Sequence, residues 1–172
     1  VEDRSYLWYI ASALVMALAG GFLLAVLLPL AITGVIPWET RVPQLTQAHG
    51  WAQLQGWAGL FVAGMAMRLI PRFAGRPPVP GTVTLPVLAL LVGGIVLRTV
   101  AQPAIIGTAG DVLMVVAGAS GSLGMLGVAA VLVVTLAKGR KRPEPWRYFA
   151  WAGAAWWAAW AVLGLAAAWR AA

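Results

Sequence analysis

Five long apolar runs dominate the chain, and short stretches rich in proline, glycine and arginine separate them. Each run is close to the roughly 20 apolar residues that an α-helix needs to cross the hydrocarbon layer of a bilayer. Because lipid cannot pair free backbone amide and carbonyl groups, we expect these runs to be helical. The sequence therefore predicts an all-α, polytopic membrane bundle with five transmembrane helices, at about residues 6–31, 48–70, 82–100, 108–137 and 148–169.

Proline and glycine residues mark where the predicted helices end. We expect a loop over residues 33–47, and Pro71 followed by Gly75 predicts the turn after the second helix. Proline removes a helical hydrogen bond and glycine accepts a positive φ angle, so the pair is typical of a turn. Pro103 closes the third helix in the same way. Residues 1–172 contain no internal repeat and no separate soluble segment, so we interpret them as one transmembrane domain, either whole or the N-terminal part of a larger membrane protein.

Small residues recur at helical spacing along the fourth run. They would let a neighbouring helix approach closely, as small residues do in membrane helix pairs. This small-residue face consists of Ala117, Gly118, Gly121, Ser122 and Gly124. A second stripe, on the fifth run, consists of Gly153, Trp157, Trp160 and Gly164. We interpret it as packing surface rather than as a cofactor site.

Composition supports the membrane assignment and removes several classes of function. The chain is 62% hydrophobic and 10% charged, which is more apolar than a soluble domain of this size. It has no cysteine, which excludes disulfides, iron–sulfur clusters and thiolate zinc sites. The net charge of +7 does not indicate a nucleic-acid partner, because the basic residues lie between the apolar runs. Membrane topology places them there, so a lipid bilayer is the predicted surrounding.

The basic residues also predict the orientation of the chain. With five spans, nine cations fall on the N-terminal side of the membrane and three on the other. The larger group is Arg4, Arg68, Arg72, Arg76, Lys138, Arg140, Lys141, Arg142 and Arg147, and the smaller is Arg41, Arg98 and Arg170. By the positive-inside rule, we expect a multi-pass protein of a bacterial-type inner (plasma) membrane, with its N-terminus in the cytoplasm and its C-terminus outside.

His49 is the only histidine in the chain and the first candidate for chemistry. On a 3.6-residue period it shares a face with Gln53, Gly56 and Gly64, and the glycines would leave a groove for a planar macrocycle or for another helix. Imidazole is the usual protein ligand of haem iron. However, the predicted position is close to the membrane interface. From spacing alone, a histidine that bonds to water or to a loop carbonyl is the simpler interpretation.

The segment around His49 resembles a helix of a known haem protein. Ala48-His49-Gly50, with Gly64 and Pro71 further along, is similar to the second helix of the large subunit of haem–copper oxidases. In that family a histidine followed by glycine ligates the low-spin haem near the outer side of the membrane. The resemblance covers about residues 47–80.

The same stretch also resembles the NnrS family, whose members are haem- and copper-containing membrane proteins linked to nitric-oxide metabolism. The matching positions are Leu54, Gly56, Trp57, Ala58, Gly59, Ala63, Gly64, Pro71, Gly75, Arg76, Pro77 and Pro78. That family carries a His-Ala-His pattern, and here only His49 is present because Trp51 occupies the second histidine position. Both families have more helices than this chain predicts.

The resemblance implies a haem site in which His49 is the iron ligand, with Gln53 and Gly56 on the same helix face. Arg41 and Arg98 fall on the same predicted side of the membrane. Each would pair with a haem propionate or, as an ordinary interfacial side chain, extend toward water. One imidazole cannot build a copper centre, which needs several nitrogen or sulfur ligands.

Three functions remain open at this point. The first is a haem-binding membrane protein for electron transfer or for handling nitric oxide or oxygen, with a second iron ligand from another subunit or from a homodimer partner. The second is a non-catalytic membrane subunit or scaffold that packs against partner helices. The third is a small transporter, which interrupted helices would suit, although paired repeats and buried charges are missing.

Overall fold

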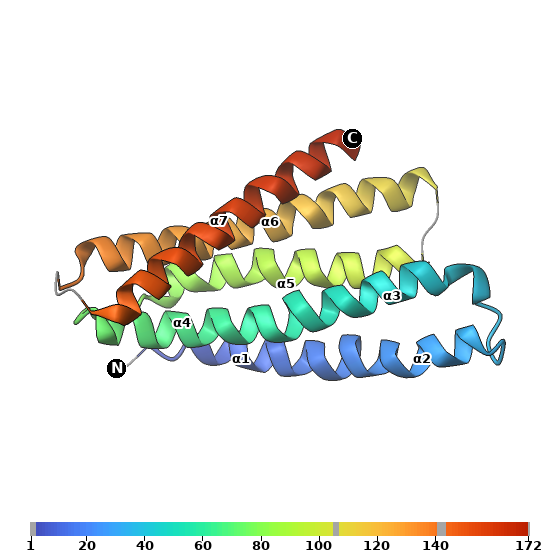
Figure 1. Cartoon of the computed structure of the whole chain (residues 1–172), viewed down its shortest axis with the longest axis horizontal. Coiled ribbons are helices and arrows are strands. Elements are labelled where there is room, and N and C mark those ends of the chain that lie inside the picture. The colour runs from blue at the N-terminus through green and yellow to red at the C-terminus, as the bar shows by residue number, and fades with distance from the viewer. Residues whose placement is uncertain (1–2, 105–106, 141–143, 172) are drawn as a thin grey trace.

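The computed structural model describes residues 3–104, 107–140 and 144–171, and throughout these ranges the chain forms helices and loops without a strand. Five helical rods run roughly along the long axis of the molecule (Figure 1), which confirms the predicted all-α membrane bundle. Four of them are long and apolar enough to cross a membrane. These four are Tyr6–Ile32, Gly81–Pro103, Thr108–Lys138 and Pro145–Ala166.

The first two rods are built from several segments each. The first rod consists of α1 (Tyr6–Val15), the π-helical η1 (Met16–Phe22) and α2 (Leu23–Ile32). The second rod consists of the short 3-10 helix η2 (Glu39–Arg41), α3 (Val42–Trp51), the π-helical η3 (Ala52–Gly59) and α4 (Leu60–Phe73). The other three rods are single helices, α5 (Gly81–Ala104), α6 (Thr108–Lys138) and α7 (Pro145–Ala171).

The second rod is longer than the predicted span 48–70 at both of its ends. Its main helix begins at Val42, and Pro43 lies in the first turn, where a missing N–H costs nothing. The helix then passes through Pro71 and ends at Phe73, so Pro71 does not form the turn. The turn lies at Gly75, whose φ angle is +65°. A proline within the last turn removes a single hydrogen bond, which the rest of the helix tolerates.

Polarity explains why the second rod is absent from the four apolar candidates. Its side chains include Gln53, Gln55 and Arg68, which lower its hydropathy below that of the other rods. In the bundle it contacts the first rod, α5 and α6, so neighbouring helices share the space around it. Polar groups in a membrane bundle face its interior in this way.

The other predicted helix ends agree with the structure to within a few residues, with one correction. The third span was expected to close at residue 100, ahead of Pro103, but α5 continues through Pro103 to Ala104. Lys141 and Arg142, which were counted for the orientation, lie outside the described residues, and so does the side chain of Arg170.

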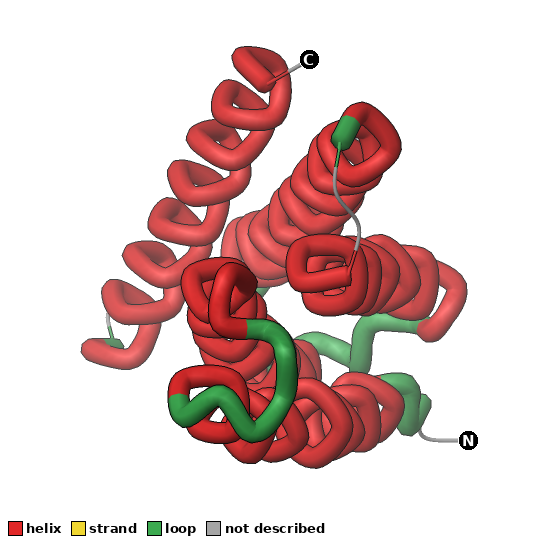
Figure 2. The backbone as a smooth tube through the Cα atoms, turned by 90° about the vertical axis from the view of Figure 1, so that its right-hand side faces the viewer, coloured by secondary structure: helices red, strands yellow, loops and turns green. Residues whose placement is uncertain are grey.

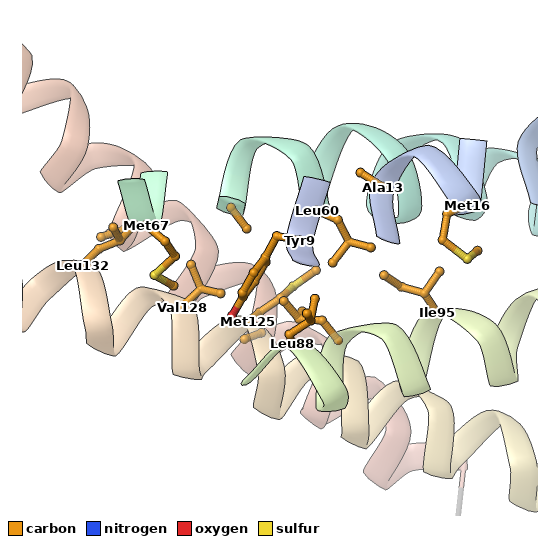
Figure 3. Packing of buried hydrophobic residues seen from close by; sticks show 14 of the residues in the cluster. Tyr9, Ala13, Met16, Leu60, Met67, Leu88, Ile95, Met125, Val128 and Leu132 are labelled. Atoms are coloured by element: carbon orange, nitrogen blue, oxygen red, sulfur yellow. The ribbon is translucent and has the colours of Figure 1, made fainter. Parts of the chain in front are cut away.

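The hydrophobic core lies where the first two rods meet α5 and α6. Tyr9 and Leu60 are almost completely buried there, together with Val128 of α6 (Figure 3). The Tyr9 hydroxyl donates a hydrogen bond of 2.6 Å to the carbonyl oxygen of Thr84, so this large polar ring is satisfied at its tip. The bond also fixes the first rod to the start of α5.

Part of the predicted small-residue face of α6, at Ala117, Gly121 and Gly124, is confirmed as a close contact with α5, whereas Ser122 lies against Gly164 of α7. A Cβ atom added at Gly94 of α5 would lie 2.5 Å from the backbone nitrogen of Gly121 and 2.8 Å from the carbonyl oxygen of Ala117. Such distances are possible only where two backbones touch without side chains between them. Further along the same contact, Gly124 lies against Leu91 in the same way.

The last helix, α7, lies at the side of the bundle and diverges from it toward the C-terminus (Figures 1 and 2). Only 11% of its most apolar stretch is buried, compared with 33–44% for the other three apolar helices. Trp157 packs against the core, but Trp156 remains 68% exposed. Within the predicted packing stripe, Trp157 contacts the core and Gly164 lies against Ser122 of α6. At Gly153 nothing in the described chain lies within 4 Å of an added Cβ atom, so the stripe is only partly used.

Candidate functional site

His49 lies within the second rod rather than at its start. It is the eighth residue of α3, which places it roughly 10 Å from the helix end at about 1.5 Å per residue. The side chain is partly buried, and its Nδ1 atom lies 3.0 Å from the carbonyl oxygen of Gly21 in η1. A π-helical turn of the first rod therefore provides the hydrogen-bond partner of the imidazole.

The glycine groove predicted beside His49 is filled by the first rod. A Cβ atom at Gly56 would lie 3.0 Å from Cβ of Met16, and one at Gly64 would lie 2.8 Å from Cβ of Tyr9. The groove was expected to hold either a planar macrocycle or another helix, and in the structure a helix fills it. Gln53 faces the same rod, because its amide would be the first group to meet a side chain added at Gly21.

Trp51 and Arg98 form a second polar feature, on another side of the second rod. Trp51 follows His49 by two positions, which is about 200° of helical rotation, so the two rings point in nearly opposite directions. The guanidinium carbon of Arg98 lies 3.9 Å from the centroid of the Trp51 ring, a cation–π contact. The Nε atom of Arg98 is buried and has no hydrogen-bond partner.

A cavity of about 380 Å³ opens beside this pair, between α3, α5, α6 and α7. Its walls are mainly apolar or formed by small residues, and among the described residues that line it Arg98 carries the only charge. We call it the Arg98 cavity. Its lining includes Trp51, Arg98, Met114, Gly121, Met125 and Trp160. Its volume is in the range of ligand sites, about 300–1,000 Å³.

Unpaired polar atoms gather on one stretch of α5, and one of them, Nε of Arg98, belongs to a residue that lines the Arg98 cavity. In the described part of the chain, three buried side-chain atoms lack a hydrogen-bond partner, and all three belong to one stretch of α5. They are Nε of Arg98, Oγ1 of Thr99 and Oε1 of Gln102. Buried polar groups in native proteins are nearly always paired, so the unpaired Nε of Arg98 is a group that a ligand in the cavity would satisfy.

The five predicted site residues do not come together. His49, Gln53 and Gly56 face the first rod, whereas Arg98 faces the cavity on another side. Arg41 donates a hydrogen bond of 2.6 Å from Nη1 to the carbonyl oxygen of Pro103, near the C-terminal end of α5. That bond satisfies one of the carbonyl groups left open at a helix end, so Arg41 has a structural role.

Sequence reasoning missed both the cavity and the role of Trp51. The sequence feature that could have pointed to the cavity was Arg98 itself, since a charged residue inside a membrane span is a functional candidate by default. It was assigned to the helix end because the third span was expected to close at residue 100. Since α5 continues to Ala104, Arg98 lies more than one turn inside the helix.

The donor set limits the metal chemistry that the described residues can support. They contain no group of three or more histidine, cysteine, aspartate or glutamate side chains that would hold a metal ion. His49 would offer only Nε2 as a ligand, because its Nδ1 atom lies against the Gly21 carbonyl oxygen. Flat space for a porphyrin is missing on the glycine face, which the first rod covers. Comparisons of the chain with protein-family models, curated proteins and solved structures found no match.

Proposed function

We propose that this membrane protein binds an amphipathic ligand with one carboxylate and an apolar body, such as a fatty acid, in the Arg98 cavity. The observation that carries the proposal is a cation with a buried, unpaired Nε atom on the wall of an otherwise uncharged cavity. The ligand would enter from the lipid phase, where its apolar body is already dissolved.

The chemistry of the cavity suits such a ligand. Trp51 covers one face of the Arg98 guanidinium, so the N–H groups at its edge are left to donate. Guanidinium and carboxylate form charge-assisted, often bidentate hydrogen bonds. A lone charge inside a membrane costs several kcal/mol unless it is paired, so a monoanion would offset that cost. Met114, Met125 and Leu163 provide the apolar wall.

The direct test is calorimetric titration of the purified protein with a long-chain fatty acid and with its methyl ester, which keeps the body and removes the charge. We expect the acid to bind about 10- to 100-fold more tightly, the range for a charge-assisted hydrogen bond. Arg98→Gln should abolish this preference and Arg98→Lys should retain part of it. Arg72→Gln, an exposed residue at the far end of the bundle, is the matched control.

Two outcomes would overturn the assignment. One is equal affinity for the acid and the ester in the native protein. The other is unchanged acid binding in Arg98→Gln, provided that circular dichroism shows the variant to be folded. In either case the Arg98–Trp51 contact is a structural pair, and the second function considered from the sequence, a non-catalytic subunit, takes precedence.

Haem binding by His49 is the second candidate, favoured by the hydrogen bond between Nδ1 and the Gly21 carbonyl. Iron-ligating histidines usually hold their other ring nitrogen in this way, which leaves Nε2 for the metal. Since the first rod fills the glycine groove, the porphyrin would have to lie between the bundle and another subunit. A two-fold related His49 would complete a bis-histidine site for electron transfer or for handling nitric oxide or oxygen.

The haem candidate is tested by the absorption spectrum of protein purified from haem-supplemented cells. A Soret band that His49→Gln removes and Arg98→Gln leaves intact would establish coordination by His49. A band that only Arg98→Gln removes would instead mean that the propionate is bound in the Arg98 cavity. A colourless native protein would end the haem proposal and leave the fatty-acid proposal standing.

The proposed orientation puts the N-terminus in the cytoplasm of a bacterial-type cell. It rests on the cations Arg4, Arg72 and Arg76, which lie at the same end of the bundle as the N-terminus. Because the chain has no cysteine, single cysteines can be introduced at the exposed positions Pro77 and Thr40, which lie at opposite ends of the second rod. A membrane-impermeant maleimide added to intact cells should label the cysteine at position 40 only. Labelling at position 77 instead would reverse the assignment.

A further inference from the structure

A second cavity lies at the end of the bundle that carries the N-terminus, far along α5 and α6 from the Arg98 cavity. Its volume is about 420 Å³, and it opens between the loop after α4 and the facing sides of α5 and α6. We call it the Arg76–Lys138 cavity. Its lining consists of Arg76, Pro77, Pro78, Val79, Pro80, Val83, Ala130, Val131, Val134, Thr135 and Lys138.

Contacts between two loops hold the mouth of this cavity in shape. Gly139, which follows α6, packs so closely on the turn after α4 that an added Cβ atom would lie 2.7 Å from Cβ of Ala74. The backbone amide of Arg140 donates a 3.0 Å hydrogen bond to the Ala74 carbonyl oxygen, and Nη2 of Arg147 donates another of 3.0 Å to the carbonyl oxygen of Leu136. Arg76 and Lys138 are therefore carried by loop and helix ends that are tied together.

The two cations at the mouth have no protein partner within the described chain. The side chains of Arg76 and Lys138 are exposed and make no hydrogen bond or ion pair within the described chain, and no carboxylate is among the lining residues. The inner wall is apolar, and its one hydroxyl, that of Thr135, donates to the Val131 carbonyl oxygen of its own helix at 2.7 Å. The cavity thus combines a doubly positive mouth with an apolar trough.

The backbone of the loop is also suited to contact with lipid. Pro77, Pro78 and Pro80 have no backbone N–H group. An unpaired N–H in contact with lipid costs several kcal/mol, and three prolines among four consecutive residues remove that cost where no helix is formed. A polar loop over the same residues would need water or a partner at each of these positions.

From this arrangement we infer that the Arg76–Lys138 cavity binds an anionic phospholipid, with its phosphate between the two cations and an acyl chain along Val83, Val131 and Val134. Basic pockets between transmembrane helices recognise acidic headgroups by the same physics. The site does not depend on the ligand of the Arg98 cavity, and either proposal can fail without the other.

The test is native mass spectrometry of the full chain, delipidated in detergent and titrated with phosphatidylglycerol or phosphatidylcholine of identical acyl chains. We expect phosphatidylglycerol to bind more tightly, and the double variant Arg76→Gln, Lys138→Gln to lose about tenfold or more of that preference, as expected for two charges near the headgroup. The matched control is Arg4→Gln, Arg72→Gln. It removes the same charge from the same end of the bundle, yet neither residue lines the cavity.

Two further measurements distinguish a lipid whose acyl chain lies in the trough from an anion that binds only to the two cations. Val134→Trp, which fills the trough but keeps both cations, should reduce lipid binding. Inorganic phosphate at the same concentration should compete poorly, because it cannot occupy the trough. If the double variant does not fold by circular dichroism, Lys138→Gln alone is measured in its place.

The inference is overturned by any of three results. Equal binding of the two lipids would remove the headgroup preference. Equal losses in the cavity variant and in the control would show that the whole basic end attracts lipid without a site. Full competition by inorganic phosphate would make the cavity an anion site and exclude the acyl chain from recognition.

Discussion

The helices α5 and α7 both lie along α6, but their contacts with it are of different kinds. At Gly94 the backbone of α5 touches that of α6 at Gly121, whereas at Gly164 α7 meets a side chain of α6, the hydroxyl of Ser122. Lipid provides no hydrophobic drive for one membrane helix to join another, so close packing has to hold them together. The glycine contact makes α5 part of a tightly packed body. The last helix is a side element that lipid or another chain can reach.

The Arg98 cavity lies at the boundary between these two kinds of packing. Gly121 belongs to its lining and to the tight contact, while Trp160 of α7 forms the opposite wall. A ligand there would contact the backbone-packed pair α5 and α6 on one side and the more exposed helix α7 on the other.

The largest effect is expected when the backbone contact is broken. Gly94→Ala places a methyl group 2.5–2.8 Å from backbone atoms of α6, which cannot move aside as a side chain can. We expect a loss of about 3 kcal/mol or more in the free energy of unfolding, the upper end for overpacking. The measurement is unfolding in mixed micelles followed by circular dichroism.

The neighbouring Gly93→Ala is the control for that substitution. Its added methyl group would come no closer than 3.8 Å to Ser120, which is ordinary contact. Similar stabilities for the two variants would mean that α5 and α6 are not in close contact through Gly94, and the contrast between α5 and α7 would be lost.

A smaller effect is expected from the hydrogen bond that joins the first rod to α5. Tyr9→Phe removes the 2.6 Å bond to the Thr84 carbonyl oxygen and leaves the ring in place. We expect a destabilisation of about 1 kcal/mol, typical for one buried hydrogen bond. Tyr148→Phe, at the exposed start of α7, should change the stability by less than the error of the same unfolding measurement. If the two substitutions have equal effects, Tyr9 does not join these rods as described.

The carboxylate of Asp3 provides a second, pH-dependent test of the contact between the N-terminal segment and the start of α5, because it accepts a hydrogen bond from the backbone amide of Gly81. Hydrogen bonds from the backbone amide and the hydroxyl of Ser5, and from the backbone amide of Gly81, lower the pKa of Asp3 below its ordinary value of 3.8. Its stabilising contribution is therefore complete above that ordinary value and is lost as the pH falls through the lowered one. We expect a small effect because the side chain is partly exposed to water.

In thermal melts in micelles from pH 6 to pH 2, the difference in melting temperature between the native protein and Asp3→Asn should become smaller, because residue 3 can gain a proton only in the native protein. A gap that widens toward low pH would contradict the assigned hydrogen bonds. Asp111→Asn, at the exposed start of α6, is the carboxylate control.

The smallest effect is expected on the outer side of α7. Trp156 is 68% exposed, so Trp156→Ala should change the free energy of unfolding by no more than about 0.5 kcal/mol. Trp157→Ala, which removes a ring packed against the core, should cost distinctly more in the same unfolding assay. A strong destabilisation by Trp156→Ala would instead show that a second chain covers this face, and the contrast with α5 would then hold only for the isolated subunit.

Hydropathy alone was sufficient to predict the class of fold and the number of helices, but it did not predict all their ends. The prolines at positions 71 and 103 were expected to close helices, and both lie inside them. A proline near a helix end disturbs few backbone hydrogen bonds, and lipid gives the chain a strong reason to remain helical. The ends are therefore decided by neighbouring packing, which a single sequence does not contain.

The candidate site was predictable only in part, because its partners come from different helices. Arg98 was singled out from its sequence position, but its contact with Trp51 depends on how the second rod is turned relative to α5. The glycines beside His49 were identified as a groove, and only the arrangement of the first rod decides what fills it. Both questions concern helix rotation, which hydropathy does not determine.

The π-helical segment η3 determines that rotation within the second rod. Along the second rod, a stripe of buried residues recurs at every fourth position through η3 and the helices on either side of it. The stripe consists of Ala48, Ala52, Gly56, Leu60 and Gly64. In uninterrupted α winding each four-residue step turns by about 400°, so such a stripe would drift about 40° per step around the rod. Wider π turns correct much of that drift, which keeps the stripe facing one neighbour. The segment therefore sets the rotation of one half of the rod relative to the other. Deleting one of its residues would rotate the half that bears His49 and Trp51 by about 100° about the helix axis relative to the half that bears Gly64.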